Sequence, residues 1–100
     1  SWNVSDDWGS GFVGHLTITN GSDEMVHHWT LVFDTPGYTI TSLWDGVLMS
    51  QENGVATVMN ETWNGHLHPG DSVTIGFVAN GADNPPTTVI MNQSPVLPGP

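Results

Sequence analysis

Residues 6–20 read DDWGSGFVGHLTITN, a polar turn followed by an extended segment. In the extended segment, Phe12, Leu16 and Ile18 recur with the period of two that places alternate side chains on one face of a β-strand. In the turn, Trp8 is flanked by carboxylates and by a Gly-Ser-Gly run, residues that favour turns and bring too little bulk to bury an indole. The stretch predicts a strand that buries Phe12 and displays Trp8; the alternative is that Trp8 folds back as a lid over the edge of a sandwich.

The same alternation recurs along the chain, without a sustained helical period. Val, Ile and Thr are frequent, and 12 glycines and 7 prolines separate the extended segments. This composition predicts an all-β fold, an antiparallel β-sandwich of the immunoglobulin-like or jelly-roll-like kind. We expect strands at residues 1–5, 12–20, 27–34, 38–43, 55–59, 72–78 and 87–91.

A chain of 100 residues is long enough for one hydrophobic core and too short for two, so we expect one sandwich over residues 1–93. Residues 94–100 contain three prolines and one glycine, a composition typical of the start of an interdomain linker. No signal peptide is visible, and we expect the chain to be a module of a longer, secreted, extracellular protein. Compatible with that location are four Asn-x-Ser/Thr sequons, at Asn3, Asn20, Asn60 and Asn92.

Charge excludes some classes of partner. The chain has ten acidic residues and no lysine or arginine, for a net charge of −10, which argues against nucleic acid and anionic membranes. Two explanations stay open: adaptation to high salt, which screens the self-repulsion and which we favour, and selection for a neutral polar binding surface. Cysteine is absent, so the chain has neither disulfides nor thiolate chemistry.

Trp8, Trp44 and Trp63 lie where predicted strands meet turns, out of phase with the buried pattern, whereas Trp29 is in phase and is expected in the core. Several exposed indoles make an apolar patch of the kind that marks a binding surface. Indole faces suit the axial C–H faces of sugars, and two strand spacings, roughly 10 Å, match one disaccharide of a β-1,4-linked polymer. At about 2 kcal/mol each, three such contacts predict roughly micromolar binding after the cost of association.

A series of short motifs follows in order along the chain: Trp8-Gly-Ser-Gly-Phe12, Thr19-Asn20, His28-Trp29-Thr30-Leu31, Trp44, Glu61-Thr62-Trp63-Asn64-Gly65, Leu67-x-Pro69-Gly70 and Ile75-Gly76-Phe77. In order and spacing they resemble family 2 carbohydrate-binding modules, over about residues 2–93. The resemblance implies a non-catalytic β-sandwich appended to a cellulase, xylanase or chitinase.

The resemblance also implies a binding site. The family's crystalline-polysaccharide binders use three coplanar surface tryptophans, which correspond here to Trp8, Trp44 and Trp63. In the xylan-binding branch an arginine, three residues after the first of these, turns its ring out of plane. That position is Gly11 here, which implies the branch that binds insoluble cellulose first, or chitin as a close second. The chain departs from many members in lacking a terminal disulfide and in being so acidic.

Polar residues near the tryptophans are the candidate hydrogen-bonding partners of the sugar. They are Asp45, Gln51, Asn64 and Asn84, and for each the alternative is a solvated turn residue. We expect no cofactor and no metal: His66-x-His68 and His27-His28 lack a third ligand at a telling spacing. We also expect no catalysis, because the acidic residues lie in turns and a domain this small has little room for a cleft.

The competing interpretation is an extracellular structural or adhesion sandwich whose tryptophans bind protein or pack against a neighbouring domain. It predicts tryptophans that are buried or lie on different faces, whereas sugar binding predicts one exposed, nearly flat row. The expected function is therefore to anchor a secreted glycoside hydrolase, tethered in the same chain, to insoluble β-1,4-glycan.

Because a neutral sugar supplies no counter-charge, binding to insoluble glycan should survive molar salt, and stacking should even strengthen there. Depletion assays at low and molar sodium chloride measure this directly. An affinity that collapses as the salt rises would show that charge, and not stacking, drives the binding.

Overall fold

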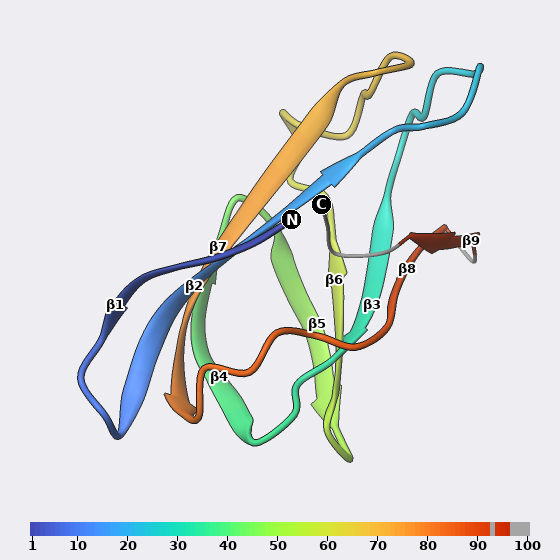
Figure 1. Ribbon diagram of the computed structural model, residues 1–100. Helices are drawn as coiled ribbons and strands as arrows, with labels where there is room; N and C mark the ends of the chain where they lie inside the picture. Colours follow the sequence, from blue (N-terminus) through green and yellow to red (C-terminus); the bar gives the residue numbers. More distant parts are fainter. Residues whose placement is uncertain (93, 97–100) are drawn as a thin grey trace.

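The computed structural model describes residues 1–92 and 94–96 and confirms the antiparallel β-sandwich. One sheet has the strand order β1-β2-β7-β4 and the other β5-β6-β3-β8-β9, and Figure 1 shows the two layers face to face. No helix occurs among the described residues, hence none long and apolar enough to cross a membrane. The strands are β1 (Trp2–Asp7), β2 (Gly11–Thr19), β3 (Thr30–Asp34), β4 (Tyr38–Trp44), β5 (Val47–Glu52), β6 (Val55–Met59), β7 (Ser72–Gly81), β8 (Val89–Met91) and β9 (Ser94–Val96).

The core lies between the sheets and follows the predicted alternation. Phe12 and Leu16 of β2 are fully buried, as are Ile75 and Phe77 of the neighbouring strand β7. Trp29 is also fully buried, as predicted, although β3 begins at Thr30, three residues after the predicted start at residue 27. The outward positions of β2 and β7 carry glycine, hydroxyl and other polar side chains, together with the paired Val13 and Val78.

The hairpin between β5 and β6 has an Asn-Gly turn, and its first strand is one that the sequence does not predict. Asn53 and Gly54 both have positive φ (53° and 75°), as the Asn-Gly signature requires for a two-residue turn. β5 itself is an edge strand, largely exposed, and its register shifts between Leu48 and Ser50. Without a buried face, the strand lacks the alternation by which sequence analysis finds strands.

The linker expected at residues 94–100 does not begin where the sequence places it. Ser94–Val96 forms β9, which pairs with β8. Proline is tolerated there because β9 is the last strand of its sheet, where one side of the backbone has no ladder to complete. Residues 97–100 lie outside the described residues, and for them the linker stays a prediction.

Gln51 joins the two sheets where β5 runs beside β4. Its side-chain Oε1 accepts a hydrogen bond from the backbone N–H of Ile40 (2.6 Å), and its Nε2 donates to the Ile40 carbonyl (3.0 Å). β4 is the outer strand of its sheet, so these backbone groups of buried Ile40 receive from Gln51 the partners that a further strand would supply.

Replacing Gln51 by methionine should lower the free energy of unfolding by about 1–3 kcal/mol, because the Ile40 backbone groups lose their partners while side-chain volume is kept. Urea denaturation measures the loss. Ser50→Ala, at an exposed position of the same strand, is the matched control. Equal stability of the two variants would mean that water replaces the Gln51 amide without cost.

Candidate glycan-binding face

The three tryptophans that the sequence singles out are the most exposed of the five. Their exposed fractions are 49% for Trp8, 38% for Trp44 and 68% for Trp63. Trp2 is partly buried and packs against the core, and Trp29 is fully buried. Because an indole exposes so much apolar area only where nothing covers it, these three side chains are available to a ligand.

The Trp44 indole packs against the outer face of the four-stranded sheet at Gly76, which has no side chain to exclude it. Trp44 ends β4 and pairs with Gly76 of β7, whose neighbours Ile75 and Phe77 point into the core, so Gly76 faces outward. A Cβ atom at Gly76 would come within 2.6 Å of Cζ2 of the Trp44 indole. The indole therefore occupies the space that a side chain at position 76 would fill, and we call such a position a glycine seat.

Trp8 has a seat of the same kind on Gly11. The Trp8 N–H donates to the Gly11 carbonyl (3.0 Å), which closes the turn, and a Cβ at Gly11 would lie 2.9 Å from Cζ2 and Nε1 of the indole. The ring thus folds back onto the sheet while its other face stays open. Gly11 and His15 both face outward on β2, and His15 is the register partner of Gly76. The two seats are four residues apart along the sheet, roughly 13 Å.

Trp63 belongs to the loop between β6 and β7, which polar contacts hold beside Trp44. Asn64 accepts a hydrogen bond from the Glu61 N–H on its Oδ1 (2.8 Å) and donates from Nδ2 to the Asp45 carbonyl (2.7 Å). The Asn64 carbonyl accepts the indole N–H of buried Trp29 (2.8 Å). Trp8 and Trp44 thus lie on one face of the four-stranded sheet, and the loop that carries Trp63 is hydrogen-bonded to the turn after Trp44.

A protein-family model described as "Cellulose binding domain" matches residues 1–95. The chain belongs to this family. It is a non-catalytic carbohydrate-binding module, as the resemblance implied.

The module is similar to parts of longer enzymes. Chitinase 63 of Streptomyces plicatus is 38% identical over 82 residues, which are 81% of this chain and 13% of that protein. Endoglucanase A of Thermobispora bispora is 31% identical over 90 residues, 89% of this chain and 20% of that protein. The solution structure of the chitin-binding domain of Chi18aC from Streptomyces coelicolor superposes with a TM-score of 0.74 at 33% identity, and the match covers 92% of this chain and 87% of that domain.

The polar candidates of the module fall into two groups. Asp45 follows Trp44 and Asn64 follows Trp63 in the sequence, and a hydrogen bond joins the two. Oδ1 and Nδ2 of the Asn64 side chain are both engaged with the protein, so the structure gives Asn64 a positioning contact. Asp45 has a positive φ of 64° in the turn after β4. Gln51 bonds the Ile40 backbone, as described above, and is not part of the tryptophan row. Asn84 is exposed and donates to the Pro36 carbonyl (3.0 Å), at the end of β4 remote from Trp44.

Two carboxylates adjoin the Trp8 turn. Asp7 Oδ1 accepts a hydrogen bond from the Gly9 N–H (2.9 Å), and this bond, followed by one with the Asp83 carboxyl, lowers the pKa of Asp7. The bond with Asp7, then burial and the Asp7 charge, raise the pKa of Asp83. Asp7 is thus an acceptor within the turn that carries Trp8.

His15 lies beside Trp44 on this face, where its neighbours on β2 are Val13 and Thr17. The imidazole centroid is 6.3 Å from that of the Trp44 ring, and His15 Nε2 lies 3.0 Å from the Ser5 hydroxyl. Further along, Thr17 and Thr74 pair through their hydroxyls (2.8 Å). The alternation of β2 already places His15 outward in the sequence. What sequence reasoning missed is Gly76, because only strand pairing shows which ring lies over it.

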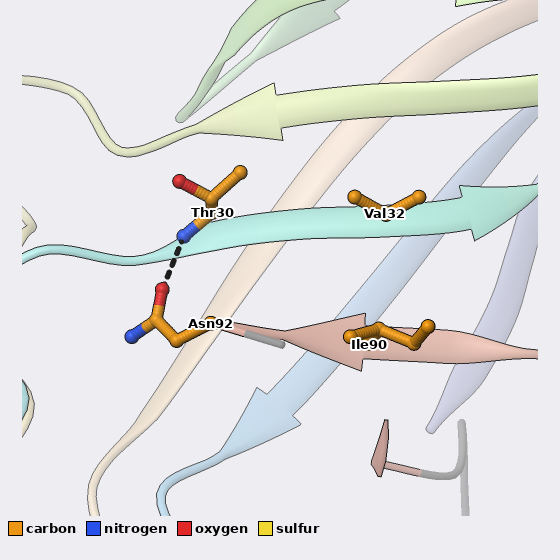
Figure 2. A pocket seen from close by; sticks show the side chains of 4 residues that line it. All are labelled: Thr30, Val32, Ile90 and Asn92. Atoms are coloured by element: carbon orange, nitrogen blue, oxygen red, sulfur yellow. Dashed lines mark hydrogen bonds between the residues drawn. The ribbon is translucent and has the colours of Figure 1, made fainter. Parts of the chain in front are cut away.

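The opposite face of the sandwich carries a shallow hollow of about 650 Å³ over β3 and β8. Thr30, Val32, Ile90 and Asn92 line it, and Figure 2 shows Asn92 accepting a hydrogen bond from the Thr30 N–H (2.8 Å). The Asn92 Nδ2 donates to the His28 carbonyl (2.9 Å). The Asn92 amide is thus hydrogen-bonded to the backbone through both its oxygen and its nitrogen. None of the described residues that line the hollow is aromatic, so they offer no ring on which a sugar could stack.

Gly76→Ala should displace the Trp44 indole, because the added Cβ overlaps the body of the ring. Among the indole N–H signals in a ¹H–¹⁵N spectrum, that of Trp44 should move most. Gly21→Ala is the matched control, since nothing lies within 4 Å of a Cβ there. An unmoved Trp44 signal in a folded Gly76→Ala variant would refute the glycine seat.

Proposed function

We propose that the module anchors a secreted glycoside hydrolase to an insoluble, crystalline β-1,4-linked glycan, cellulose or chitin, by stacking of Trp8, Trp44 and Trp63 on its sugar rings. The observation that carries the proposal is the glycine seating of Trp8 and Trp44 on one sheet face, with the loop of Trp63 hydrogen-bonded to the turn that follows Trp44. A row of this kind suits a long, flat ligand better than a short, enclosed one.

The energetics fit a reversible anchor. Covering about 100 Å² of each indole contributes on the order of 2 kcal/mol, and three such contacts, less the cost of association, lead to roughly micromolar affinity. Gly11 and Gly76 beneath the two rings let the indoles lie close to the sheet, which favours approach of a flat polymer. Asp45 and Asn84 are the remaining candidates for sugar hydroxyls, while Gln51 and Asn64 serve mainly to position backbone.

Relatives support both glycans, since a chitinase and an endoglucanase contain similar segments. Attachment to an enzyme rests on the same relatives, in which the matched part is a small fraction of the chain. Secretion follows from the substrate, because an insoluble polymer must be met outside the cell. We favour adaptation to a saline habitat as the explanation for the net charge of −10.

The adhesion sandwich is the weaker alternative. It requires tryptophans that are buried or spread over different faces. Trp8 and Trp44 lie on the same face of one sheet, both exposed, with the loop of Trp63 bonded to the turn that follows Trp44. A protein partner would also leave the glycine seats without a reason.

The deciding experiment is depletion of the protein from solution by microcrystalline cellulose, chitin and insoluble xylan. Trp8→Ala, Trp44→Ala and Trp63→Ala should each weaken binding roughly 30-fold, the equivalent of about 2 kcal/mol, on the same polymer. Met49→Ala removes a comparably exposed apolar side chain (57%) from β5 of the other sheet and should leave binding unchanged.

Retention on cellulose or on chitin identifies the glycan. Failure of the folded wild-type protein to bind any of the three polymers would overturn the proposal in favour of the adhesion sandwich. Binding that survives all three tryptophan variants would place the site elsewhere on the module.

A further inference from the structure

Two histidines far apart in the sequence face each other across a two-residue bridge. Val26 and Leu67 exchange both backbone hydrogen bonds, each 2.8 Å long, as an antiparallel pair. The next pair along such a ladder, His27 and His66, is directly opposed, the arrangement that brings side chains closest. The two imidazole centroids are 5.6 Å apart, with ring planes at 90°, and both residues are exposed.

We propose that His27 and His66 form a binding site for a divalent transition-metal ion, with Cu²⁺, Ni²⁺ and Zn²⁺ as its class of ligand. Two imidazoles on one metal, with metal–nitrogen distances of about 2.0–2.1 Å, have centroids roughly 5 Å apart. The observed separation therefore needs only a small adjustment of two exposed side chains. The backbone bridge beneath them is already formed, so little chain entropy opposes chelation.

The surroundings decide which ions fit. Imidazole is a borderline donor that suits Cu, Ni and Zn, whereas Mg²⁺ and Ca²⁺ prefer oxygen ligands. In the part of the chain that the structure describes, no three histidine or acidic side chains form a metal-holding group, so water completes the coordination. The net charge of −10, with no lysine or arginine, favours approach of a cation. We expect affinity in the order Cu²⁺ above Ni²⁺ and Zn²⁺.

A bound ion would add a link between two segments that the Val26–Leu67 bridge and the hydrogen bonds of Trp29 with Asn60 and Asn64 already join. One segment leads to the buried Trp29, and the other is the loop that carries Trp63. Binding to the folded state alone raises stability in proportion to the logarithm of metal concentration. The site is thus a stabilising clamp, and it is independent of whether glycan binds the tryptophans.

The test uses the whole chain without a polyhistidine tag, titrated with CuCl₂ and NiCl₂ by isothermal calorimetry in molar sodium chloride, which screens loose binding to carboxylates. We expect one ion per chain and at least a 10-fold loss of affinity in both His27→Gln and His66→Gln. His28→Gln, next to the pair and also exposed, is the matched control and should bind as the wild type does.

Thermal unfolding supplies the second measurement. At metal concentrations about 100-fold above the dissociation constant, the Tm of the wild type should rise by about 5 °C or more, and that of His66→Gln should not. Calcium chloride should have no such effect on either protein. Equal metal affinity in wild type, His27→Gln and His66→Gln, or a loss as large in His28→Gln, would overturn the proposal, as would several weak ions per chain.

Discussion

The binding face depends on space that absent side chains leave. Gly11 and Gly76 point outward from neighbouring strands, and an indole lies over each where a Cβ would stand. Inside the sandwich, the Trp2 ring likewise packs against a glycine, since a Cβ at Gly14 would come within 2.7 Å of it. Close packing of this kind holds a large ring flat without a hydrogen bond, since any tilt loses contact with the sheet.

A buried indole positions an exposed one. Trp29, fully enclosed, donates its ring N–H to the Asn64 carbonyl, and its backbone N–H donates to Asn60 Oδ1 (2.9 Å). Both asparagines belong to the segment that carries Trp63. The burial of Trp29 in the core therefore also positions the loop that carries Trp63. Asn64 connects that loop to the turn after Trp44 by donating a hydrogen bond to the Asp45 carbonyl.

The chain has no lysine or arginine, and several of its loops are held by hydrogen bonds between asparagine side chains and the backbone. Asn20 is 1% exposed; its Nδ2 donates to the carbonyls of Glu24 and Leu67, and its Oδ1 accepts from Ser22. Asn60 and Asn92 are likewise bonded to backbone. Asn20 thus uses both N–H groups of its amide within the fold, whereas Asn60 and Asn92 each use one.

The sequence by itself determined the sandwich, the buried faces of β2 and β7, the core position of Trp29 and the exposure of three tryptophans, because period-two burial and turn residues are local patterns. It did not reveal β5, an edge strand without a buried face, or β9, whose proline resembles a linker. Only the tertiary structure decided that the Trp44 indole packs on Gly76 and that the Gln51 amide hydrogen-bonds the Ile40 backbone. It alone also decided that the imidazoles of His27 and His66 lie side by side. Each of these depends on strand register, which joins residues distant in sequence and leaves no local pattern.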